Sequence, residues 1–316
     1  MSDGAKEGRA GDPAGGAAGD RPDAPVVGVI GLGDIGAGVA TSVLAAGLPL
    51  VVCDLRTEVT DGFADRATVA GSPAELAGSA DVVVVAVVDD AQVHAVLSGP
   101  DGALAAARPG AACIVVSTIS APCVEAIGAE AAAVGVDIVD CGVSGGPSAA
   151  ATGDLVCMVG GDPATIGRVQ PVLDAMGSLV VRMGPFGAGL TAKLARNLVQ
   201  YGSWLAAYEG QVLAEAAGID LAKLAQVIKA SDARIGGTST LMFRSTVAPF
   251  TDADDAGLVG WMASAAALAH KDLAAAVQAG QALGVDLPLA AMAERRADDI
   301  FGVGSGQTGP TGQEAS

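Results

Sequence analysis

VVGVIGLGDIG, at residues 26–36, is a short apolar run followed by three glycines in the order Gly-x-Gly-x-x-Gly, and an alanine-rich segment of helical length comes next. This context predicts a strand, a tight turn and a helix whose N-terminus faces the pyrophosphate of a dinucleotide. Gly31 permits the turn, Gly33 lets the backbone approach the anion, and Gly36 lets the helix pack closely on the strand. The predicted cofactor-binding turn comprises Gly31, Leu32, Gly33, Asp34, Ile35 and Gly36.

An acidic residue ends the second predicted strand. Asp54 lies 18 residues beyond Gly36, where a carboxylate can accept hydrogen bonds from an adenosine ribose, and this favours NAD. Arg56, two positions further on, is the alternative signal, because an arginine here can bind the 2′-phosphate of NADP. The sequence therefore predicts a nicotinamide dinucleotide, with a preference for NAD over NADP.

Short valine-rich runs alternate with alanine-rich segments up to residue 183, as in a parallel sheet covered by helices. Strands are predicted at 26–30, 50–54, 82–88, 113–117, 136–140, 155–159 and 179–182. Beyond a Gly/Pro cluster at 183–187 the pattern becomes helical, at 188–217, 220–230, 261–283 and 288–301. We predict a doubly wound α/β domain over 25–183 and an all-helical domain over 184–303.

The two ends of the chain have a different composition. Residues 1–24 mix Gly, Ala, Pro and charges without an apolar centre, and residues 304–316 have the same character. Such segments cannot bury enough apolar surface to offset the entropy of ordering, so we expect two disordered tails. No secretory signal is recognisable at the start, which predicts a cytoplasmic protein.

The overall charge narrows the choice of partners. The chain carries 17 Lys and Arg against 35 Asp and Glu, a net charge of −18, which disfavours nucleic acid and anionic membrane surfaces. Its apolar runs are far shorter than the ~20 residues that span a bilayer. The five cysteines form no C-x-x-C pair and there are only two histidines, so we expect no metal site and a small-molecule ligand.

The segment DCGVSGGP at residues 140–147 places a hydroxyl and two glycine amides at the end of a predicted strand. Ser144, Gly145 and Gly146 would form a small concave set of N–H and O–H donors, which suits a carboxylate. Taken alone, the segment favours an ordinary glycine-rich connecting turn.

A second segment, GPFGAGLTAKLARN at residues 184–197, enters the first long helix. Lys193 and Asn197 are four residues apart, so they share one helix face and can point at one ligand. A solvated lysine on a helix face is the ordinary alternative for such a residue.

Together these segments resemble the β-hydroxyacid dehydrogenase family, which includes 3-hydroxyisobutyrate dehydrogenases and tartronate semialdehyde reductases, over about residues 25–302. Residues 140–146 are similar to the family's D-A-P-V-S-G-G, with Gly142 in place of Pro, and residues 184–197 to its G-x-x-G-x-G-x-x-x-K-x-x-x-N. The resemblance implies a Rossmann-type doubly wound parallel sheet followed by an all-α C-terminal domain.

The resemblance also implies roles for the residues of these segments. Lys193 would be the catalytic acid/base that exchanges a proton with the substrate hydroxyl, and Asn197 would orient the substrate or the lysine. Ser144, Gly145 and Gly146 would bind the substrate carboxylate. General acid/base help of this kind is worth ~10²- to 10⁴-fold in rate.

Further cofactor contacts follow from the same resemblance. Residues 87–92, VVDDAQ, stand where the family places backbone beside the nicotinamide ribose, although its usual Leu-Pro is Val-Val here. Residues 270–273, HKDL, are similar to the family's K-D-L, with Asp272 as a neighbouring orienting group. The implied contacts are Val87, Val88, Gln92, Thr118 and Lys271.

The expected activity is reversible oxidation of a short 3-hydroxy acid, similar to 3-hydroxyisobutyrate, by NAD(P) in a homodimer or homotetramer. Two alternatives remain open at this point. The scaffold also serves reductases of semialdehydes or imines, and a dinucleotide-binding fold can act as a non-catalytic sensor of NAD(P)H. Lys193 argues against imine reductases, which usually replace this lysine.

Overall fold

The computed structural model describes residues 24–241, 243–244 and 246–304. The predicted tails, apart from residues 24 and 304, lie outside the described residues. The chain divides into two compact units, Met1–Leu194 and Ala195–Ser316, and each is described by itself below.

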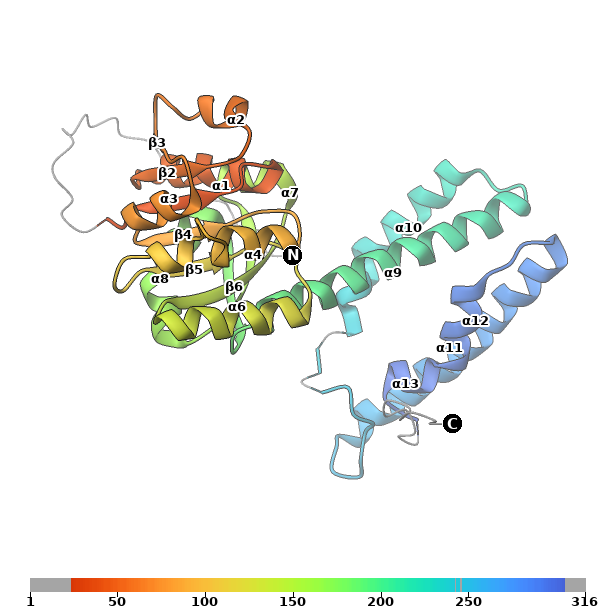
Figure 1. Cartoon of the computed structure of the whole chain (residues 1–316). Coiled ribbons are helices and arrows are strands. Elements are labelled where there is room, and N and C mark those ends of the chain that lie inside the picture. Colours follow the sequence, from red (N-terminus) through yellow and green to blue (C-terminus); the bar gives the residue numbers. More distant parts are fainter. Residues whose placement is uncertain (1–23, 242, 245, 305–316) are drawn as a thin grey trace, which may run out of the picture. The chain divides into compact units, whose positions relative to one another are not determined.

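The described part of the first unit contains an eight-stranded sheet in the order β3-β2-β1-β4-β5-β6-β7-β8 (Figure 1). The strands are β1 (Val27–Ile30), β2 (Leu50–Cys53), β3 (Thr68–Val69), β4 (Val82–Val85), β5 (Ala112–Val115), β6 (Asp137–Ser144), β7 (Leu155–Gly160) and β8 (Gly177–Gly184). This is the strand order of a Rossmann fold, extended beyond β6.

The sheet is parallel except at one pair of strands. β1 pairs parallel with both β2 and β4, whereas β6 and β7 are antiparallel, with Cys141 opposite Val159. The predicted doubly wound parallel sheet is confirmed, and the antiparallel pairing of β6 with β7 is a local departure from it. Only the short helix α7 (Gly146–Thr152) and a turn at Gly153 separate β6 from β7, which is too short for a parallel crossover.

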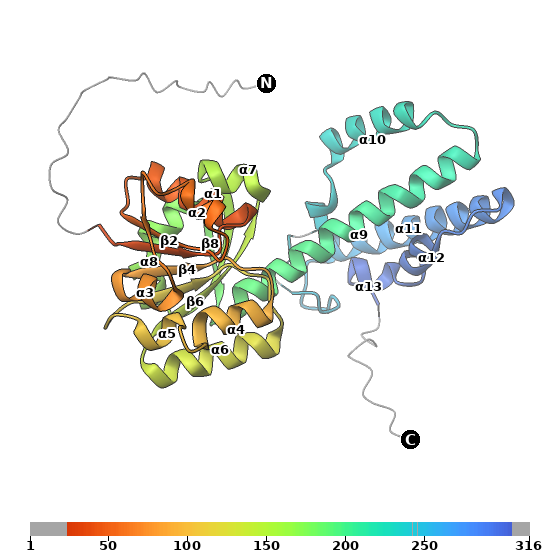
Figure 2. The same ribbon diagram turned by 45° about the horizontal axis from the view of Figure 1, so that its top comes forward.

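Helices cover both faces of the sheet, as Figures 1 and 2 show. Alternate strand residues enter two separate cores: Val27 and Val29 pack on one face and Ile30 on the other, and likewise Val84 and Val85. The first core includes side chains of α1 (Asp34–Ala45) and α8 (Pro163–Met176). The second includes α3 (Pro73–Ser79), α4 (Asp90–Ser98), α5 (Ala103–Ala106) and α6 (Ala121–Val134).

Four strands differ from the sequence prediction by two residues or more at one end at least, and one strand was not predicted. β5 ends two residues early at Val115, and β8 extends two residues beyond the prediction at both ends. β4 ends at Val85, so Val87 and Val88 lie in the following loop. β6 runs on to Ser144, and the two-residue strand β3 follows the short helix α2 (Thr57–Asp61) without having been predicted. A valine run shows that a strand is present, but the point where pairing stops depends on the neighbouring strands.

The second unit is helical in its described part. The helix α9 (Ala188–Ala216) begins in the first unit and continues into the second. It is followed by α10 (Leu221–Ile235), the 3₁₀ turn η1 (Thr238–Leu241) and α11 (Ala256–Leu283). The helix predicted over 288–301 is instead two, α12 (Pro288–Arg295) and α13 (Ala297–Phe301), because Arg296 leaves helical geometry with φ −110° and ψ 12°.

A histidine joins the last three helices of this unit. His270 on α11 lies 3.3 Å from the Glu294 carboxylate of α12 and 3.2 Å from the Asp298 carboxylate of α13. Glu294 and then Asp298 raise the pKa of His270 above 6.5. No ion pair of His270 was predicted from the sequence.

Two kinds of feature are absent from the described residues. Among the helices placed by the structure, none combines the length and the apolar character that crossing a membrane requires. No group of three or more His, Cys, Asp or Glu side chains in the same residues has a geometry that could hold a metal ion.

Candidate active site

Two glycines of the cofactor turn have no room for a side chain. Gly31 has φ +88°, and a Cβ there would lie 2.7 Å from the Ala86 carbonyl oxygen. A Cβ at Gly36 would lie 1.8 Å from the Gly31 carbonyl oxygen. The chain can therefore turn directly from β1 into α1 and press the helix against the turn.

Gly33, in contrast, faces open space. A Cβ there would meet nothing within 4 Å, and Gly33 is the N-cap of α1 without a side-chain cap. The first N–H groups of a helix have no intrahelical acceptor, so this end of α1 offers donors and a positive dipole to an anion. Leu32 is buried and contributes its backbone, Ile35 is half-buried against the core, and Asp34 is exposed.

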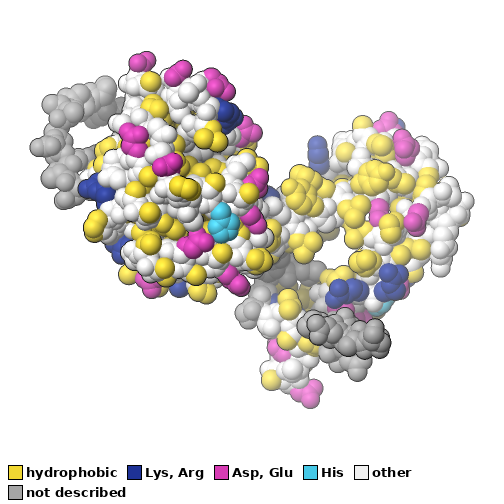
Figure 3. Space-filling view, viewed as in Figure 1, with side chains coloured by type: hydrophobic (Ala, Val, Ile, Leu, Met, Phe, Trp, Pro, Cys, Tyr) yellow, Lys and Arg dark blue, Asp and Glu magenta, His cyan; other side chains and the backbone are white. Residues whose placement is uncertain are grey.

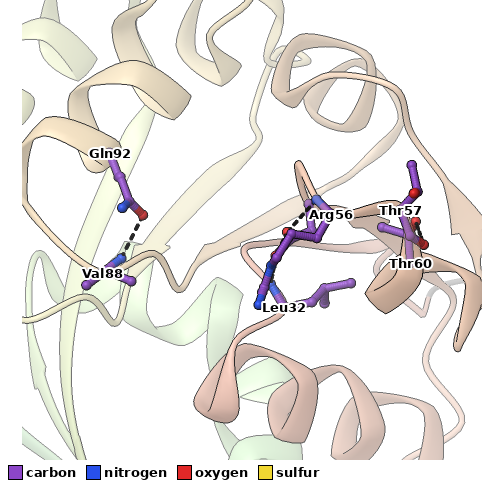
Figure 4. A network of polar contacts seen from close by, with 7 residues as sticks. Leu32, Arg56, Thr57, Thr60, Val88 and Gln92 are labelled. Carbon is purple, nitrogen blue, oxygen red and sulfur yellow. Dashed lines mark hydrogen bonds and ion pairs between the residues drawn. The ribbon is translucent and has the colours of Figure 1, made fainter.

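Asp54 is hydrogen-bonded to the cofactor turn. Its Oδ2 accepts from the Leu32 N–H at 2.6 Å, and its two oxygens accept from Arg56 Nε at 3.0 Å and an Arg56 terminal nitrogen at 3.1 Å. Burial raises the pKa of Asp54, but the bonds from Arg56 and Leu32 outweigh it and bring the pKa to about 2. Figure 4 shows the Arg56 side chain beside Leu32.

The loop after β4 packs against the same turn. A Cβ at Gly31 would lie 2.9 Å from Val87 Cγ1, and Val88 is 78% exposed. The Val88 N–H donates to the Gln92 side-chain oxygen at 3.2 Å (Figure 4), and the Gln92 N–H donates to Asp89, the N-cap of α4. The predicted contacts Val87, Val88 and Gln92 thus belong to one capped loop beside Gly31.

Thr118 lies exposed in the loop after β5, next to the buried Ser117. This loop is joined to α4 by Ser120, whose N–H donates to Asp90 Oδ1 at 3.0 Å and whose hydroxyl donates to Asp90 Oδ2. These bonds from Ser120 lower the pKa of Asp90. The loop that carries Thr118 is therefore held to the first turn of α4, which carries Gln92.

The segment from Ser144 to Gly146 forms the turn between β6 and α7. Ser144 is the last residue of β6 and half-buried, and Gly145 and Gly146 have φ +133° and +73°. A Cβ at Gly145 would also meet Ala149 Cβ at 2.6 Å, whereas one at Gly146 would meet nothing. The backbone after Ser144 thus needs glycine and is open at Gly146.

Lys193 lies on the second turn of α9 and reaches this strand end. Its Nζ donates a hydrogen bond to the carbonyl oxygen of Val143, the residue before Ser144. Lys193 is half-buried, and a Cβ at Gly142 would lie only 2.5 Å from Lys193 Cβ. The fold therefore brings the predicted acid/base and the predicted carboxylate donors together inside one compact unit, although the Lys193–Val143 contact spans 50 residues of sequence.

Two predicted residues belong to the helical unit. Asn197 follows Lys193 by one turn of α9, is half-buried and accepts from Arg196 at 3.4 Å. Lys271 on α11 forms an ion pair of 3.2 Å with Asp272, and its side chain is 71% exposed.

Asp140 is fully buried in β6, and no role for it was predicted from the sequence. Its Oδ1 accepts from the Gly187 N–H and its Oδ2 from the Leu190 N–H, both at 2.6 Å. Burial raises the pKa of Asp140, and the N–H groups of Leu190 and Gly187 oppose this effect. An acidic residue inside an apolar strand, four residues before the donor-rich turn begins at Ser144, was the available signal.

A Rossmann domain with a glycine turn, in which a lysine at the start of a long helix meets a donor-rich strand end, is the arrangement of an NAD(P)-dependent oxidoreductase. Residues 26–184 match the family described as the NAD binding domain of 6-phosphogluconate dehydrogenase. Residues 187–307 match the family described as NAD-binding of NADP-dependent 3-hydroxyisobutyrate dehydrogenase. The chain belongs to the β-hydroxyacid dehydrogenase family, whose members are NAD(P)-dependent enzymes of the EC 1.1.1 type.

Curated relatives cover most of the chain. It is 37% identical to an uncharacterized oxidoreductase of Mycobacterium tuberculosis, over 92% of this chain and 97% of that protein. It is 36% identical to the L-threonate dehydrogenase of Cupriavidus necator (85% and 88%) and 34% identical to the NAD-dependent L-serine dehydrogenase of Pseudomonas aeruginosa (84% and 88%).

Solved structures show the same architecture. A putative oxidoreductase from Mycobacterium avium is 36% identical, with a TM-score of 0.80 over 88% of this chain and 99% of that one. The Mycobacterium tuberculosis 3-hydroxyisobutyrate dehydrogenase with L-serine is 29% identical, with a TM-score of 0.63 over 88% and 94%. An imine reductase from Myxococcus stipitatus shares the fold at 19% identity, with a TM-score of 0.71 over 90% and 96%.

Proposed function

We propose that this chain oxidises a short 3-hydroxy acid, similar to 3-hydroxyisobutyrate, or reduces the corresponding semialdehyde, with NAD as the preferred cofactor. The observation that carries the proposal is the contact of Lys193 with the strand end that leads into Ser144, Gly145 and Gly146. A proton-transfer group and a set of carboxylate donors lie at one place, as a hydroxyacid substrate requires.

In the proposed reaction each residue has its own chemical role. Ser144 and the backbone N–H groups of Gly145 and Gly146 bind the substrate carboxylate, because they offer donors without a competing side chain. Lys193 takes the proton of the substrate hydroxyl during oxidation and returns it during reduction. Asn197, one turn further along α9, orients the substrate with its amide.

The geometry of the cofactor turn suits a dinucleotide. Gly31 and Gly36 keep the turn tight, and the open space at Gly33 admits an anion to the N-terminus of α1. When bound, the nicotinamide accepts or donates the hydride that the reaction transfers. In the proposed site the pyrophosphate lies against residues 31–36, and the remaining contacts come from Val87, Val88, Gln92, Thr118 and Lys271.

The preference for NAD is supported by the state of the Asp54–Arg56 pair. Asp54 has a pKa of about 2 and is ionised at neutral pH, so it repels a 2′-phosphate. Arg56 is already paired with Asp54 at 3.0 Å, which leaves its guanidinium less available as a phosphate clamp. The NAD-dependent L-serine dehydrogenase among the relatives supports the same choice.

We also propose the domain limits 25–183 and 184–303, which lie close to the limits of the two family matches. By contacts, the compact units part further along, between Leu194 and Ala195 within α9. A cytoplasmic location is proposed because the five cysteines, Cys53, Cys113, Cys123, Cys141 and Cys157, are all buried free thiols, as in reducing compartments.

A second copy of this chain is the proposed protein partner, in a homodimer or homotetramer. Large apolar side chains recur along α9 at alternating spacings of four and three residues and are largely exposed. They are Leu194 (52%), Leu198 (75%), Tyr201 (59%), Leu205 (46%) and Tyr208 (62%). Figure 3 shows hydrophobic side chains on the surface of the helical unit. We call this set the α9 stripe. Such spacing is typical of a helix that packs on another helix.

Reduction of other semialdehydes or imines is the alternative within this fold, supported only by fold likeness to an imine reductase. A non-catalytic NAD(P)H sensor is the alternative outside catalysis. A sensor has no need for a half-buried lysine at a carboxylate-donor turn, so the contact of Lys193 with Val143 favours the enzyme.

The test is formation of NADH from NAD, or of NADPH from NADP, at 340 nm by the purified protein, against 3-hydroxyisobutyrate, L-serine and L-threonate. Lys193→Ala should lower kcat by ~10²- to 10⁴-fold, whereas Lys229→Ala on the exposed part of α10 should not change it. Turnover without any loss in Lys193→Ala would contradict the assigned role. Binding of NADH without turnover would move the search to semialdehydes and imines, and binding of neither cofactor would refute the proposal.

A further inference from the structure

The buried carboxylate of Asp140 lies at the N-terminus of α9. It accepts hydrogen bonds from the Gly187 and Leu190 N–H groups at 2.6 Å, before and within the first helical turn. These are groups that the helix itself leaves without acceptors, and a negative charge here interacts favourably with the helix dipole. Asp140 therefore ties the beginning of α9 to β6.

Three glycines let the helix backbone rest directly on the sheet. A Cβ at Gly189 would lie 2.3 Å from the Met158 carbonyl oxygen, and one at Gly160 would lie 2.2 Å from Asp140 Oδ1. A Cβ at Gly142 would lie 2.5 Å from Lys193 Cβ and 2.7 Å from the Gly189 carbonyl oxygen. We call Gly142, Gly160 and Gly189 the glycine seat.

The position of Lys193 depends on both the hydrogen bonds to Asp140 and the glycine seat. It lies three residues after Leu190, whose N–H is held by Asp140, and its own Cβ stands against Gly142. Its Nζ then meets the Val143 carbonyl oxygen, next to Ser144. A shift or rotation of the first turn of α9 would break the bonds to Asp140 and move Lys193 away from the strand end together.

We propose that Asp140, acting through the glycine seat, is a positioning residue for Lys193. It does not touch the reacting atoms; it sets the height and rotation of the helix turn that carries the acid/base. The proposal rests on the function proposed above for Lys193. In this reading Gly142, where the family usually has Pro, is required in this chain because any added side-chain atom would meet Lys193.

The test compares Asp140→Asn with Asp137→Asn. Asp137 lies on the same strand but is exposed and pairs with Arg168 of α8, so it is a matched control. Asp140→Asn presents an amide NH₂ where a backbone N–H needs an acceptor. We expect it to lower kcat by ~10- to 100-fold, since misplacement of about 1 Å can cost that much, with the NADH dissociation constant changed less than twofold.

A second readout does not depend on the reaction. The rate at which Lys193 is acetylated by an amine-reactive reagent, followed by peptide mass spectrometry, reports its environment directly. Asp140→Asn should change this rate by at least about threefold, whereas Lys223 and Lys229 on α10 should react as in the wild type. Unchanged acetylation of Lys193 together with wild-type kcat in folded Asp140→Asn would overturn the proposal.

If Asp140→Asn does not fold, Gly142→Ala decides, because it keeps Asp140 and presses on Lys193 Cβ. It should reduce kcat and alter Lys193 acetylation, whereas Gly167→Ala on α8, where a Cβ meets nothing within 4 Å, should do neither. A Gly142→Ala protein with wild-type kcat and a wild-type rate of Lys193 acetylation would overturn the proposed role of the glycine seat. Should Lys193→Ala itself remain active, the proposed function fails, while the acetylation rates still test the positioning.

Discussion

The Leu32 N–H donates a 2.6 Å hydrogen bond to Asp54 Oδ2, so the end of β2 is tied to the glycine turn that follows β1. Asp54 therefore holds the glycine turn in place, and it is also the predicted hydrogen-bond acceptor for the cofactor ribose. Because Arg56 also binds this carboxylate, one side chain links the cofactor turn, the end of β2 and the nearest cation.

Asp54→Ala should raise the KM for NAD by roughly 10- to 100-fold, the effect of losing hydrogen bonds to a charged group. The released Arg56 should at the same time favour NADP, so the ratio of kcat/KM for the two cofactors should move toward NADP. Steady-state kinetics with both cofactors measures this. Asp65→Ala, at an exposed position beyond α2, is the control, and an unchanged ratio in Asp54→Ala would remove Asp54 from cofactor selection.

Glu209 on α9 caps a different helix. Its carboxylate is 6% exposed and accepts from the Leu289 N–H at 2.7 Å and the Ala290 N–H at 3.0 Å, at the start of α12, where the N-cap Leu287 has no side-chain bond. Glu209→Ala should lower the free energy of unfolding by about 1–3 kcal/mol, since it leaves buried donors unpaired. Urea titration measures it, and Glu215→Ala on the exposed side of α9 should stay within about 0.5 kcal/mol.

The pairing of His270 with Glu294 and Asp298 predicts a pH-dependent stability. Because the folded pKa lies above 6.5, the stabilisation is fully present below that pH and is lost as the pH rises through the folded pKa. Thermal unfolding from pH 6 to 9 should show a fall in midpoint that His270→Gln lacks. The same fall in His270→Gln would assign it to other groups, and His94→Gln on α4 is the histidine control.

Charge placed on the α9 stripe should weaken self-association. Leu198→Glu combined with Tyr201→Glu puts two carboxylates into an apolar contact, where burying an unpaired charge is costly. Light scattering after size exclusion should report a smaller species at equal concentration. Ala207→Glu, on another face of α9, is the control, and an unchanged mass for the stripe variant would exclude this face as the interface.

Local sequence was sufficient for much of the first unit. Strands β1, β2 and β7 lie within one residue of their predicted limits, since a valine-rich run between turn residues describes a buried strand without reference to distant partners. The run 82–88 failed at its end, because Val87 and Val88 look like strand residues but lie beyond the last paired position of β4. Likewise the break at Arg296 leaves no local signal strong enough to divide 288–301.

The sequence by itself determined the glycine turn at residues 31–36, the alternation of strands and helices, and the mainly helical character of the described residues after 187, because each depends on the conformational limits of nearby residues. Only the tertiary structure decided that Asp140 binds the start of α9, that Asp54 holds Leu32, and that Lys193 reaches Val143. These contacts join residues 22 to 50 positions apart. Their partners are set by strand order and by close packing of glycine backbones, which no local pattern encodes.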